Sequence, residues 1–273
     1  MRRRSHSARA VVTGAGSGIG RAFALELARR GGQVVCADID LTRAQQTAEQ
    51  IGPRALAVQC DVSSLHDVES LAKTAEEFLS GPVDLLINNA GVGSGGRDVG
   101  ELPMDDWQWV LGINLWGVIY GCHVFGPGLR GAGAAGIINV ASSAAWGAMP
   151  GMSAYNVSKA GVLALSETMA AELSGTDVTV TVLCPTFVKT NVVHDGRIES
   201  QAVELAEKLM RWTGMTAEAV AVHTLDAHDK GKLHVIPQRH ARVIWQTKRL
   251  MPGPYTKAMG LGFRAVSAIA KKI

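Results

Sequence analysis

The chain has 273 residues, which suits one large α/β domain, and a hydrophobic content of 47% excludes a disordered protein. The net charge is only +3 and no nucleic-acid-reading motif accompanies it, so we expect no nucleic-acid partner. Four widely spaced cysteines in apolar runs, without a CxxC pair, predict buried reduced thiols, neither a zinc site nor disulfides, and a cytoplasmic location.

Short apolar segments alternate with amphipathic ones over the first two thirds of the chain. This alternation predicts parallel strands joined by right-handed crossovers, hence an α/β fold with a doubly wound parallel sheet of the Rossmann type. The expected strands cover residues 9–13, 34–37, 55–60, 83–87, 136–141 and 178–183, and the expected helices cover 21–30, 41–51, 64–79, 104–129 and 153–173.

The pattern loosens after Pro185. We expect a loop over 191–198, an amphipathic helix over 199–211, a helix over 216–227 and a last strand over 233–236. Two basic helical segments, 239–250 and 255–272, follow and are separated by a Pro-Gly-Pro sequence. We therefore predict a catalytic domain over 1–236, with a substrate lid at about 191–214, and a basic helical extension over 237–273.

The predicted strands end in polar or turn-forming residues. Ligands of doubly wound sheets bind beyond the carboxyl ends of the strands, so these residues are expected to line one cleft. They are Thr13, Asp38, Asp61, Asn88, Ser142 and Pro185.

A glycine-rich turn joins the first strand to the first helix. Gly14, Gly18 and Gly20 allow a tight turn and let a pyrophosphate approach the helix N-terminus, where free N–H groups attract anions. Asp38, at the end of the second strand, can accept both hydroxyls of an adenosine ribose and would repel a 2′-phosphate. This pattern favours NAD over NADP as the cofactor.

Tyr155 and Lys159 are four residues apart and should share one face of a helix. A phenol normally loses its proton near pH ~10, and a neighbouring ammonium group is expected to lower that pKa. Ser142 adds a hydroxyl that can hold a substrate oxygen. Together these groups can transfer a proton to or from an alcohol.

These motifs, together with Asn88-Asn89-Ala90-Gly91 and Asn114, resemble the single-domain branch of the short-chain dehydrogenase/reductase family over residues 8–236. The resemblance implies an NAD(P)-dependent oxidoreductase of alcohols or ketones. It also implies a homo-oligomer, a dimer or a homotetramer, built on the long helices.

The resemblance implies a role for individual residues. Tyr155 would be the general acid/base, Lys159 would lower its pKa and bind the nicotinamide ribose, and Ser142 would hold the substrate oxygen. Asn114 would hold a water that links Lys159 to solvent, although it also suits a helix kink. Asn88 resembles a residue that stabilises the central sheet in this family. After Pro185 this chain has Thr186, where the family usually has glycine. The implied cofactor-binding set is Gly14, Ser17, Gly18, Ile19, Gly20, Asp38, Asp61, Val62, Asn88, Ala90, Gly91, Tyr155, Lys159, Pro185, Val188 and Thr190.

Large apolar side chains occur in the two segments that frame the substrate in this family. They are Trp146, Met149, Phe187 and Met210. We therefore expect a bulky apolar secondary alcohol or its ketone, of steroid, terpenoid or aryl type, as the substrate. The alternatives are an NADPH-dependent ketoreductase of acyl chains and a dinucleotide-binding protein without turnover.

Charge is unevenly distributed along the chain. From Gly231 onward there are nine Lys and Arg and no acid, which leaves about −6 for the residues before it. This basic segment could pack on a neighbouring subunit, which we prefer, or lie on an anionic membrane as a peripheral contact, or form a solvated helix pair.

Overall fold

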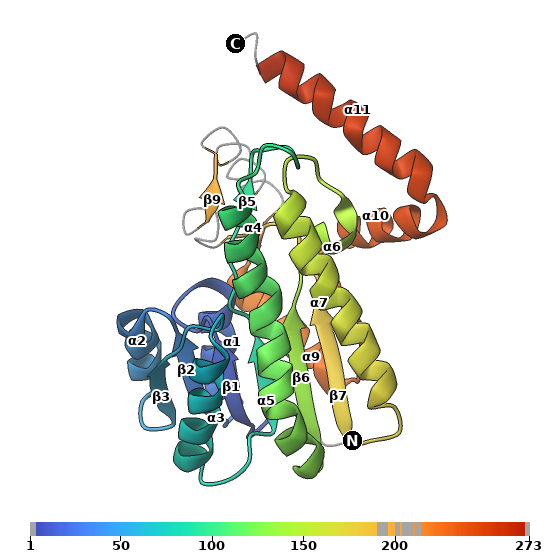
Figure 1. Cartoon of the computed structure of the whole chain (residues 1–273). Helices are drawn as coiled ribbons and strands as arrows, with labels where there is room; N and C mark the ends of the chain where they lie inside the picture. The colour runs from blue at the N-terminus through green and yellow to red at the C-terminus, as the bar shows by residue number, and fades with distance from the viewer. Residues whose placement is uncertain (1–3, 190–195, 200–202, 204–209, 211–213, 271–273) are drawn as a thin grey trace.

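A computed structural model describes residues 4–189, 196–199, 203, 210 and 214–270, and the side chains of the last five of these are not described. A seven-stranded parallel sheet forms its centre, with helices on both faces (Figure 1). The strand order is β11-β7-β6-β4-β1-β2-β3, so the chain reverses its direction of winding between β1 and β4. The strands are β1 (Arg9–Thr13), β2 (Gln33–Asp38), β3 (Ala55–Gln59), β4 (Leu85–Asn88), β6 (Ala135–Val140), β7 (Val178–Leu183) and β11 (His234–Val235).

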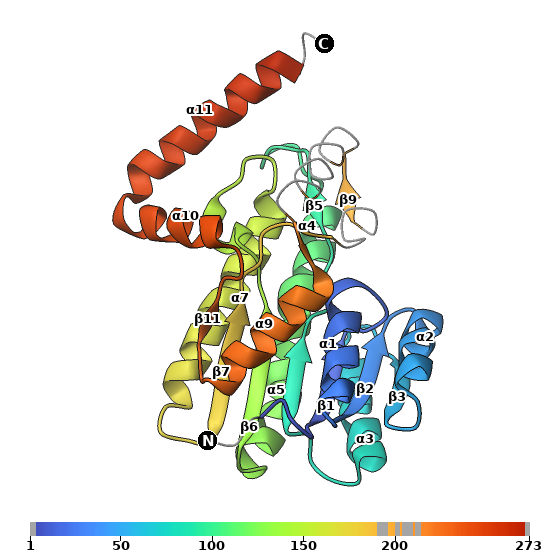
Figure 2. The same cartoon turned by 180° about the vertical axis from the view of Figure 1, so that it is seen from behind.

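Two apolar clusters cover the two faces of the sheet. One lies under α3 (Leu65–Leu79), α5 (Gly117–Gly131) and α7 (Ser153–Glu172), on the side seen in Figure 1. The other lies under α1 (Gly18–Arg29) and α9 (Ala217–Asp229), on the side seen in Figure 2. This confirms the α/β fold with a doubly wound parallel sheet that the alternation of elements predicts.

The structure also places the shorter elements. Four short strands pair outside the main sheet, β5 with β9 and β8 with β10. The remaining elements are α2 (Leu41–Ile51), α4 (Met104–Leu111), a π-helical turn η1 (Gly112–Trp116), α6 (Ala144–Gly147), α10 (Arg239–Leu250), α11 (Pro252–Ala270), β5 (Ser94–Gly95), β8 (Val188–Lys189), β9 (Arg197–Ile198) and β10 (Met215–Thr216).

Polar side chains cap the N-termini of two of the predicted helices. The Ser64 hydroxyl accepts a hydrogen bond from the backbone N–H of Asp67, and Thr216 accepts one from Ala219. Each satisfies an N–H group that the first helical turn leaves without a partner.

The structure corrects the sequence prediction at two helices. The helix expected over 104–129 is not continuous, because a π-helical turn at Gly112–Trp116 interrupts it. The last helix begins at Pro252 rather than at residue 255, since proline is well tolerated in a first helical turn, where its missing N–H costs nothing. Most of the helix expected over 199–211 lies outside the described residues.

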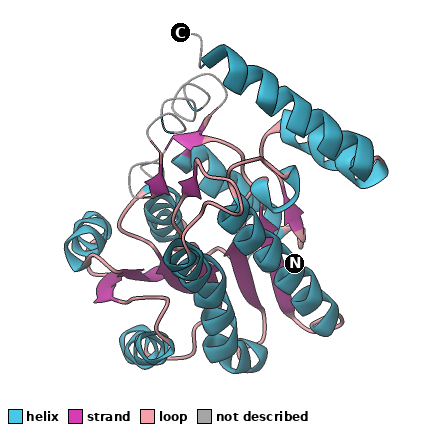
Figure 3. Ribbon diagram, turned by 45° about the horizontal axis from the view of Figure 1, so that its top comes forward, coloured by secondary structure: helices cyan, strands magenta, loops and turns pink. Residues whose placement is uncertain are grey.

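The run Met104–Gly131 is long and apolar enough to cross a membrane by composition, but it packs between α3 and α7 on the sheet. By contrast, α11 leaves the body of the molecule after α10 and extends beyond it (Figures 1 and 3). It is therefore α11, and not this apolar run, that extends beyond the body of the molecule.

Candidate active site

The glycine turn lies against the loop that follows β4. Gly14 has a φ of 64°, and a Cβ on it would stand 2.8 Å from the Cα of Ala90. A Cβ on Gly20 would overlap the carbonyl oxygen of Gly14. Ser17, the N-cap of α1, makes no side-chain cap hydrogen bond, so the first N–H groups of the helix remain available to an anion. These features fit the pyrophosphate of a dinucleotide.

Asn89 and Thr13 fix the two loops to each other. The Asn89 amide donates to the carbonyl oxygens of Thr13, at 2.9 Å, and Gly14, at 3.2 Å. In return, the Thr13 hydroxyl accepts from the backbone N–H groups of Asn89 and Ala90. Asn89 is not among the site residues predicted from the sequence. Its position in the Asn88-Asn89-Ala90-Gly91 motif could have indicated that it belongs to the site.

Asp38 lies at the end of β2, beside the glycine turn. Its carboxylate accepts hydrogen bonds from the backbone N–H groups of Gly16, at 2.8 Å, and Asp40, at 3.0 Å. A Cβ on Gly16 would also contact the side chain of Arg43. Arg43 is not among the residues predicted from the sequence, and its guanidinium pairs with the Asp40 carboxylate at 3.2 Å. The carboxylate therefore lies beside the glycine turn, with a cation nearby.

Asp61 and Val62 follow β3. The Asp61 carboxylate accepts from the backbone N–H and the hydroxyl of Ser63, at 2.9 and 2.7 Å, which closes a local turn. Val62 is buried and packs against Gly117. The polar end of β3 thus reaches the same edge of the sheet as Asp38.

Ser142, Tyr155 and Lys159 come together where β6 ends and α7 begins. Ser142 and Lys159 are buried and Tyr155 is partly buried. The Lys159 ammonium donates to the carbonyl oxygen of Val140 at 3.0 Å and lies 5.8 Å from the centre of the Tyr155 ring. The Ser142 hydroxyl accepts from the N–H of Ala144 at 3.1 Å. The structure thus brings together the three groups predicted to transfer the proton.

Burial shifts the pKa values of both groups. It raises the pKa of Tyr155 above its ordinary value, and a hydrogen bond with Ser142 acts in the opposite direction. Burial also lowers the pKa of Lys159 to about 8. Loss of solvent is thus the largest influence on the Tyr155 pKa, while the Lys159 ammonium is directed at the backbone carbonyl of Val140. That Lys159 lowers the pKa of Tyr155 stays a prediction.

Asn114 lies in the π-helical turn and is fully buried. Its side chain accepts from the N–H of Val92 at 2.7 Å, and donates to the Val92 carbonyl oxygen at 2.9 Å and to the Ser158 hydroxyl at 3.3 Å. A Cβ on Gly91 would stand 3.0 Å from Asn114 and 3.2 Å from the Lys159 ammonium. Asn114 therefore joins the loop after β4 to the catalytic helix, at an irregular turn of the kind often found in functional sites.

The side chain of Asn88 points into the core and not toward the cofactor edge. Its amide donates to Asn139 at 2.9 Å and to the Cys122 sulfur at 3.4 Å. Asn139 in turn donates to the Ser166 hydroxyl at 3.0 Å. This network joins β4, β6, α5 and α7, which agrees with the sheet-steadying role of Asn88 and leaves only its backbone for a cofactor contact.

All four cysteines are buried, as predicted, and burial raises the pKa of each thiol to about 12.

The segment after β7 is held by a residue that the sequence did not reveal. Gln238 accepts from the N–H of Thr186 at 3.2 Å and donates to the carbonyl oxygen of Phe187 at 3.2 Å, while Pro185 accepts from the N–H of Ser143 at 2.9 Å. Thr186 does not have a positive φ, so this turn does not require the glycine usual in the family. Val188 is buried in β8, and Thr190 lies outside the described residues.

The four residues predicted to contact substrate differ in exposure. Trp146, with 8% of its surface exposed, packs into the core, and Met210 is also buried, so neither presents an open surface. Phe187 is partly buried. Met149 lines a cavity of about 530 Å³ whose walls include Val99, Ala148, Pro150, Ser153 and Asn156. The predicted lid over 191–214 lies largely outside the described residues.

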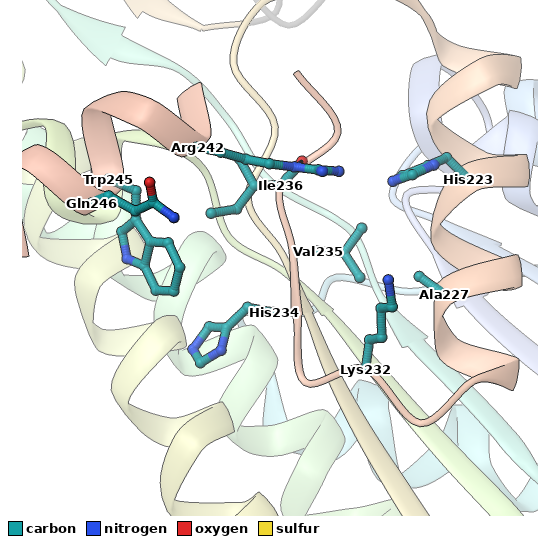
Figure 4. A pocket seen from close by; sticks show the side chains of 9 residues that line it. All are labelled: His223, Ala227, Lys232, His234, Val235, Ile236, Arg242, Trp245 and Gln246. Carbon is teal, nitrogen blue, oxygen red and sulfur yellow. Dashed lines mark hydrogen bonds between the residues drawn. The ribbon is translucent and has the colours of Figure 1, made fainter. Parts of the chain in front are cut away.

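A second cavity, of about 220 Å³, lies along β11 between α9 and α10 (Figure 4). His223, Lys232 and Arg242 are among its nine lining residues, none of which is acidic. None of the nine is a residue predicted for the active site, so this cavity is separate from the Tyr155 site.

Comparison with known proteins agrees with this geometry. A family model described as short chain dehydrogenase matches residues 8–201. The chain is 42% identical over 185 residues to "Probable oxidoreductase EphD" of Mycobacterium tuberculosis. The matched region covers 67% of this chain and 31% of that protein. It therefore spans about a third of the length of that relative.

Two further similarities cover most of the chain. It is 35% identical over 239 residues to "1-deoxy-11-beta-hydroxypentalenate dehydrogenase" of Streptomyces exfoliatus, covering 86% of this chain and 84% of that protein. The crystal structure of a short chain dehydrogenase/reductase from Burkholderia phymatum in complex with NAD superposes with a TM-score of 0.83 at 33% identity, covering 92% of this chain and 96% of that one.

Proposed function

Because this chain belongs to the short-chain dehydrogenase family, we propose that it is an NAD-dependent oxidoreductase that interconverts a bulky apolar secondary alcohol and its ketone. One observation carries the proposal. Ser142, Tyr155 and Lys159 converge at the carboxyl edge of the sheet, next to a glycine turn shaped for a pyrophosphate. A bound nicotinamide would supply or accept the hydride at that edge.

The side chains would move the proton. In ketone reduction, the hydroxyls of Ser142 and Tyr155 hold the substrate oxygen, and Tyr155 then donates its proton to that oxygen. The raised pKa of Tyr155 keeps the phenol protonated at neutral pH, which suits this direction. In alcohol oxidation Tyr155 must act as the base, and the positive charge of Lys159 favours the phenolate as it forms.

The cofactor preference follows from Asp38. Its carboxylate lies beside the glycine turn, and a carboxylate at this position would bind the hydroxyls of an adenosine ribose and repel a 2′-phosphate. Arg43 lies next to the same turn, and its positive charge would attract a 2′-phosphate, but it is already paired with Asp40. We propose NAD, and equal affinity for NAD and NADP would contradict the Asp38 argument.

The cavity beside α7, which Met149 lines, supports the substrate class. Its walls carry the apolar residues Met149, Val99, Ala148 and Pro150 together with Asp98, Ser153 and Asn156, and they lack a basic side chain among the described residues. Such a surface suits an apolar compound of steroid, terpenoid or aryl type. The S. exfoliatus relative is named for a hydroxylated compound, 1-deoxy-11-beta-hydroxypentalenate, which also supports an alcohol substrate.

A screen of apolar secondary alcohols with NAD, followed by the absorbance of the reduced cofactor, tests the proposal. We expect turnover with bulky alcohols and little with short polar ones. Turnover only with NADPH and acyl-chain ketones would favour the ketoreductase alternative, and cofactor binding without any turnover would favour a binding protein.

We also propose that the protein self-associates through its long helices. Trp116 and Val157, on η1 and α7, are both 49% exposed, which is unusual for large apolar side chains on neighbouring helices. Light scattering of the purified protein should report a dimer or a tetramer. A monomer would contradict this proposal without affecting the catalytic one.

A further inference from the structure

The segment from Gly231 onward has one sign of charge. It contains nine Lys and Arg and no acid, whereas the preceding residues sum to about −6. Most of this segment forms α10 and α11, and α11 projects from the body of the molecule (Figures 1 and 3). The segment therefore contains no acidic side chain that could neutralise its own positive charge.

The outer side of α10 exposes three large apolar side chains. Val243 and Leu250 are seven residues apart, so they lie in one column along the helix, and they are 63% and 82% exposed. Ile244, next to Val243, is 38% exposed, and Met251, the residue that follows the helix, is 54% exposed, whereas the exposed Gln246 and Thr247 between them are polar. Several large apolar side chains exposed together on one helix and at its end mark an interaction surface.

The helix α11 carries its cations on one side. Lys257 and Arg264 are seven residues apart, and this spacing places them in one column. Met259 and Phe263 lie on another side of the helix, and Phe263 is 38% exposed. A helix with cations on one side and large apolar residues on another is typical of peptides that lie in the membrane interface.

The two helices are attached to the loops around the active site. The Tyr255 hydroxyl, in the first turns of α11, donates to the carbonyl oxygen of Gly147 in α6 at 2.9 Å. Gln238, at the start of α10, bonds both Thr186 and Phe187. A surface that engages α10 and α11 is thus connected to both segments that follow Ser142 and Pro185.

We propose that α10 and α11 dock this protein on the surface of an anionic phospholipid bilayer, with Val243, Leu250 and Phe263 at the acyl boundary and the cations on lipid phosphates. Charge favours this occupant over pairing of the segment with its own copy. Two copies of an acid-free segment repel each other, whereas anionic lipid complements it. If the proposed function holds, docking also brings the segments after Ser142 and Pro185 close to a phase in which apolar alcohols dissolve.

Co-sedimentation of the full chain with vesicles tests this proposal. We expect strong binding to phosphatidylcholine mixed with phosphatidylglycerol, weaker binding to phosphatidylcholine alone, and weakening by added salt. The double variant Lys257→Gln/Arg264→Gln should bind roughly 30-fold more weakly, because each cation near an anionic surface contributes about fivefold. The matched control, Lys73→Gln/Arg130→Gln, loses the same charge from exposed positions on the body and should bind like the wild type.

A second pair of variants tests the apolar contribution. Phe263→Ser should weaken vesicle binding roughly tenfold, since an aromatic side chain no longer enters the acyl boundary. Met104→Ser, at an exposed position on α4, should leave binding unchanged.

The proposal is overturned if anionic vesicles fail to sediment the wild type, or if the helix variants bind as well as their controls. It is also overturned if these variants change the oligomeric state in light scattering and not the vesicle binding, because a second copy would then cover the helices. Dehydrogenase turnover measured on the same samples separates the two proposals, since sedimentation does not depend on activity.

Discussion

Replacement of Lys159 by methionine should make the protein more stable and less active. Lys159 is 4% exposed, and burial lowers its pKa from 10.5 to about 8. At 1.36 kcal/mol per pKa unit, holding the charged form in the fold costs about 3 kcal/mol at neutral pH. The variant loses the hydrogen bond to Val140, which contributes about 1 kcal/mol. We therefore expect Lys159→Met to raise the free energy of unfolding by about 2 kcal/mol at pH ~7.

The gain should depend on pH. Below pH ~8 Lys159 is protonated in both the folded and the unfolded wild type, so the full free-energy cost of burying its charge is present. Between about 8 and the unfolded pKa of 10.5, the unfolded state binds more protons than the folded one, so the stability of the wild type rises with pH. At pH ~9.5 the advantage of the variant should shrink by about 2 kcal/mol.

Urea unfolding at the two pH values measures both effects. Lys73→Met, at an exposed position on α3, is the matched control and should change stability by less than about 0.5 kcal/mol at either pH. A Lys159→Met variant that is less stable than the wild type at pH ~7, with no dependence on pH relative to it, would refute the argument from burial.

Three further predictions concern other buried or edge positions. Asp38→Asn should keep the fold but narrow the preference for NAD over NADP in binding titrations, because the amide no longer repels a 2′-phosphate; an unchanged preference would exclude Asp38 as its source. His228 is fully buried and its pKa is lowered to about 4, so the wild type should lose about 3 kcal/mol of stability as pH falls from 6.5 to 4, and His228→Gln should lose less, as checked by urea unfolding. Asn139→Ala should destabilise the protein by roughly 2–4 kcal/mol, since it removes the oxygen that accepts from the buried Asn88 amide and the amide that donates to the Ser166 hydroxyl; a loss below about 1 kcal/mol would mean that the network is dispensable.

The main elements of the fold could be predicted because their signals are local. Apolar runs of strand length, a helical period between them and capping residues such as Ser64 determine the alternation of strands and helices. Parallel pairing then brings the strand ends to one edge, which is why Asp38 and Ser142 could be assigned to one cleft before their positions were known.

The remaining features depend on contacts between residues far apart in the sequence. Gln238 bonds Thr186 across 52 positions, and Asn139 bonds Asn88 across 51, and neither spacing has a periodic signature. The raised pKa of Tyr155 results from burial, which depends on the whole surrounding fold. The sequence predicted that Ser142, Tyr155 and Lys159 come together, but not the direction in which burial shifts the pKa of Tyr155.

The most direct test of the central claim is turnover by Tyr155→Phe with a bulky secondary alcohol that the wild type oxidises. The phenylalanine ring keeps the shape of the site and removes only the hydroxyl that transfers the proton. We predict that the rate of nicotinamide reduction falls by roughly 10²–10⁴-fold, while the affinity for NAD stays close to that of the wild type. A variant that retains most of its turnover would contradict the assignment of Tyr155 as the acid/base.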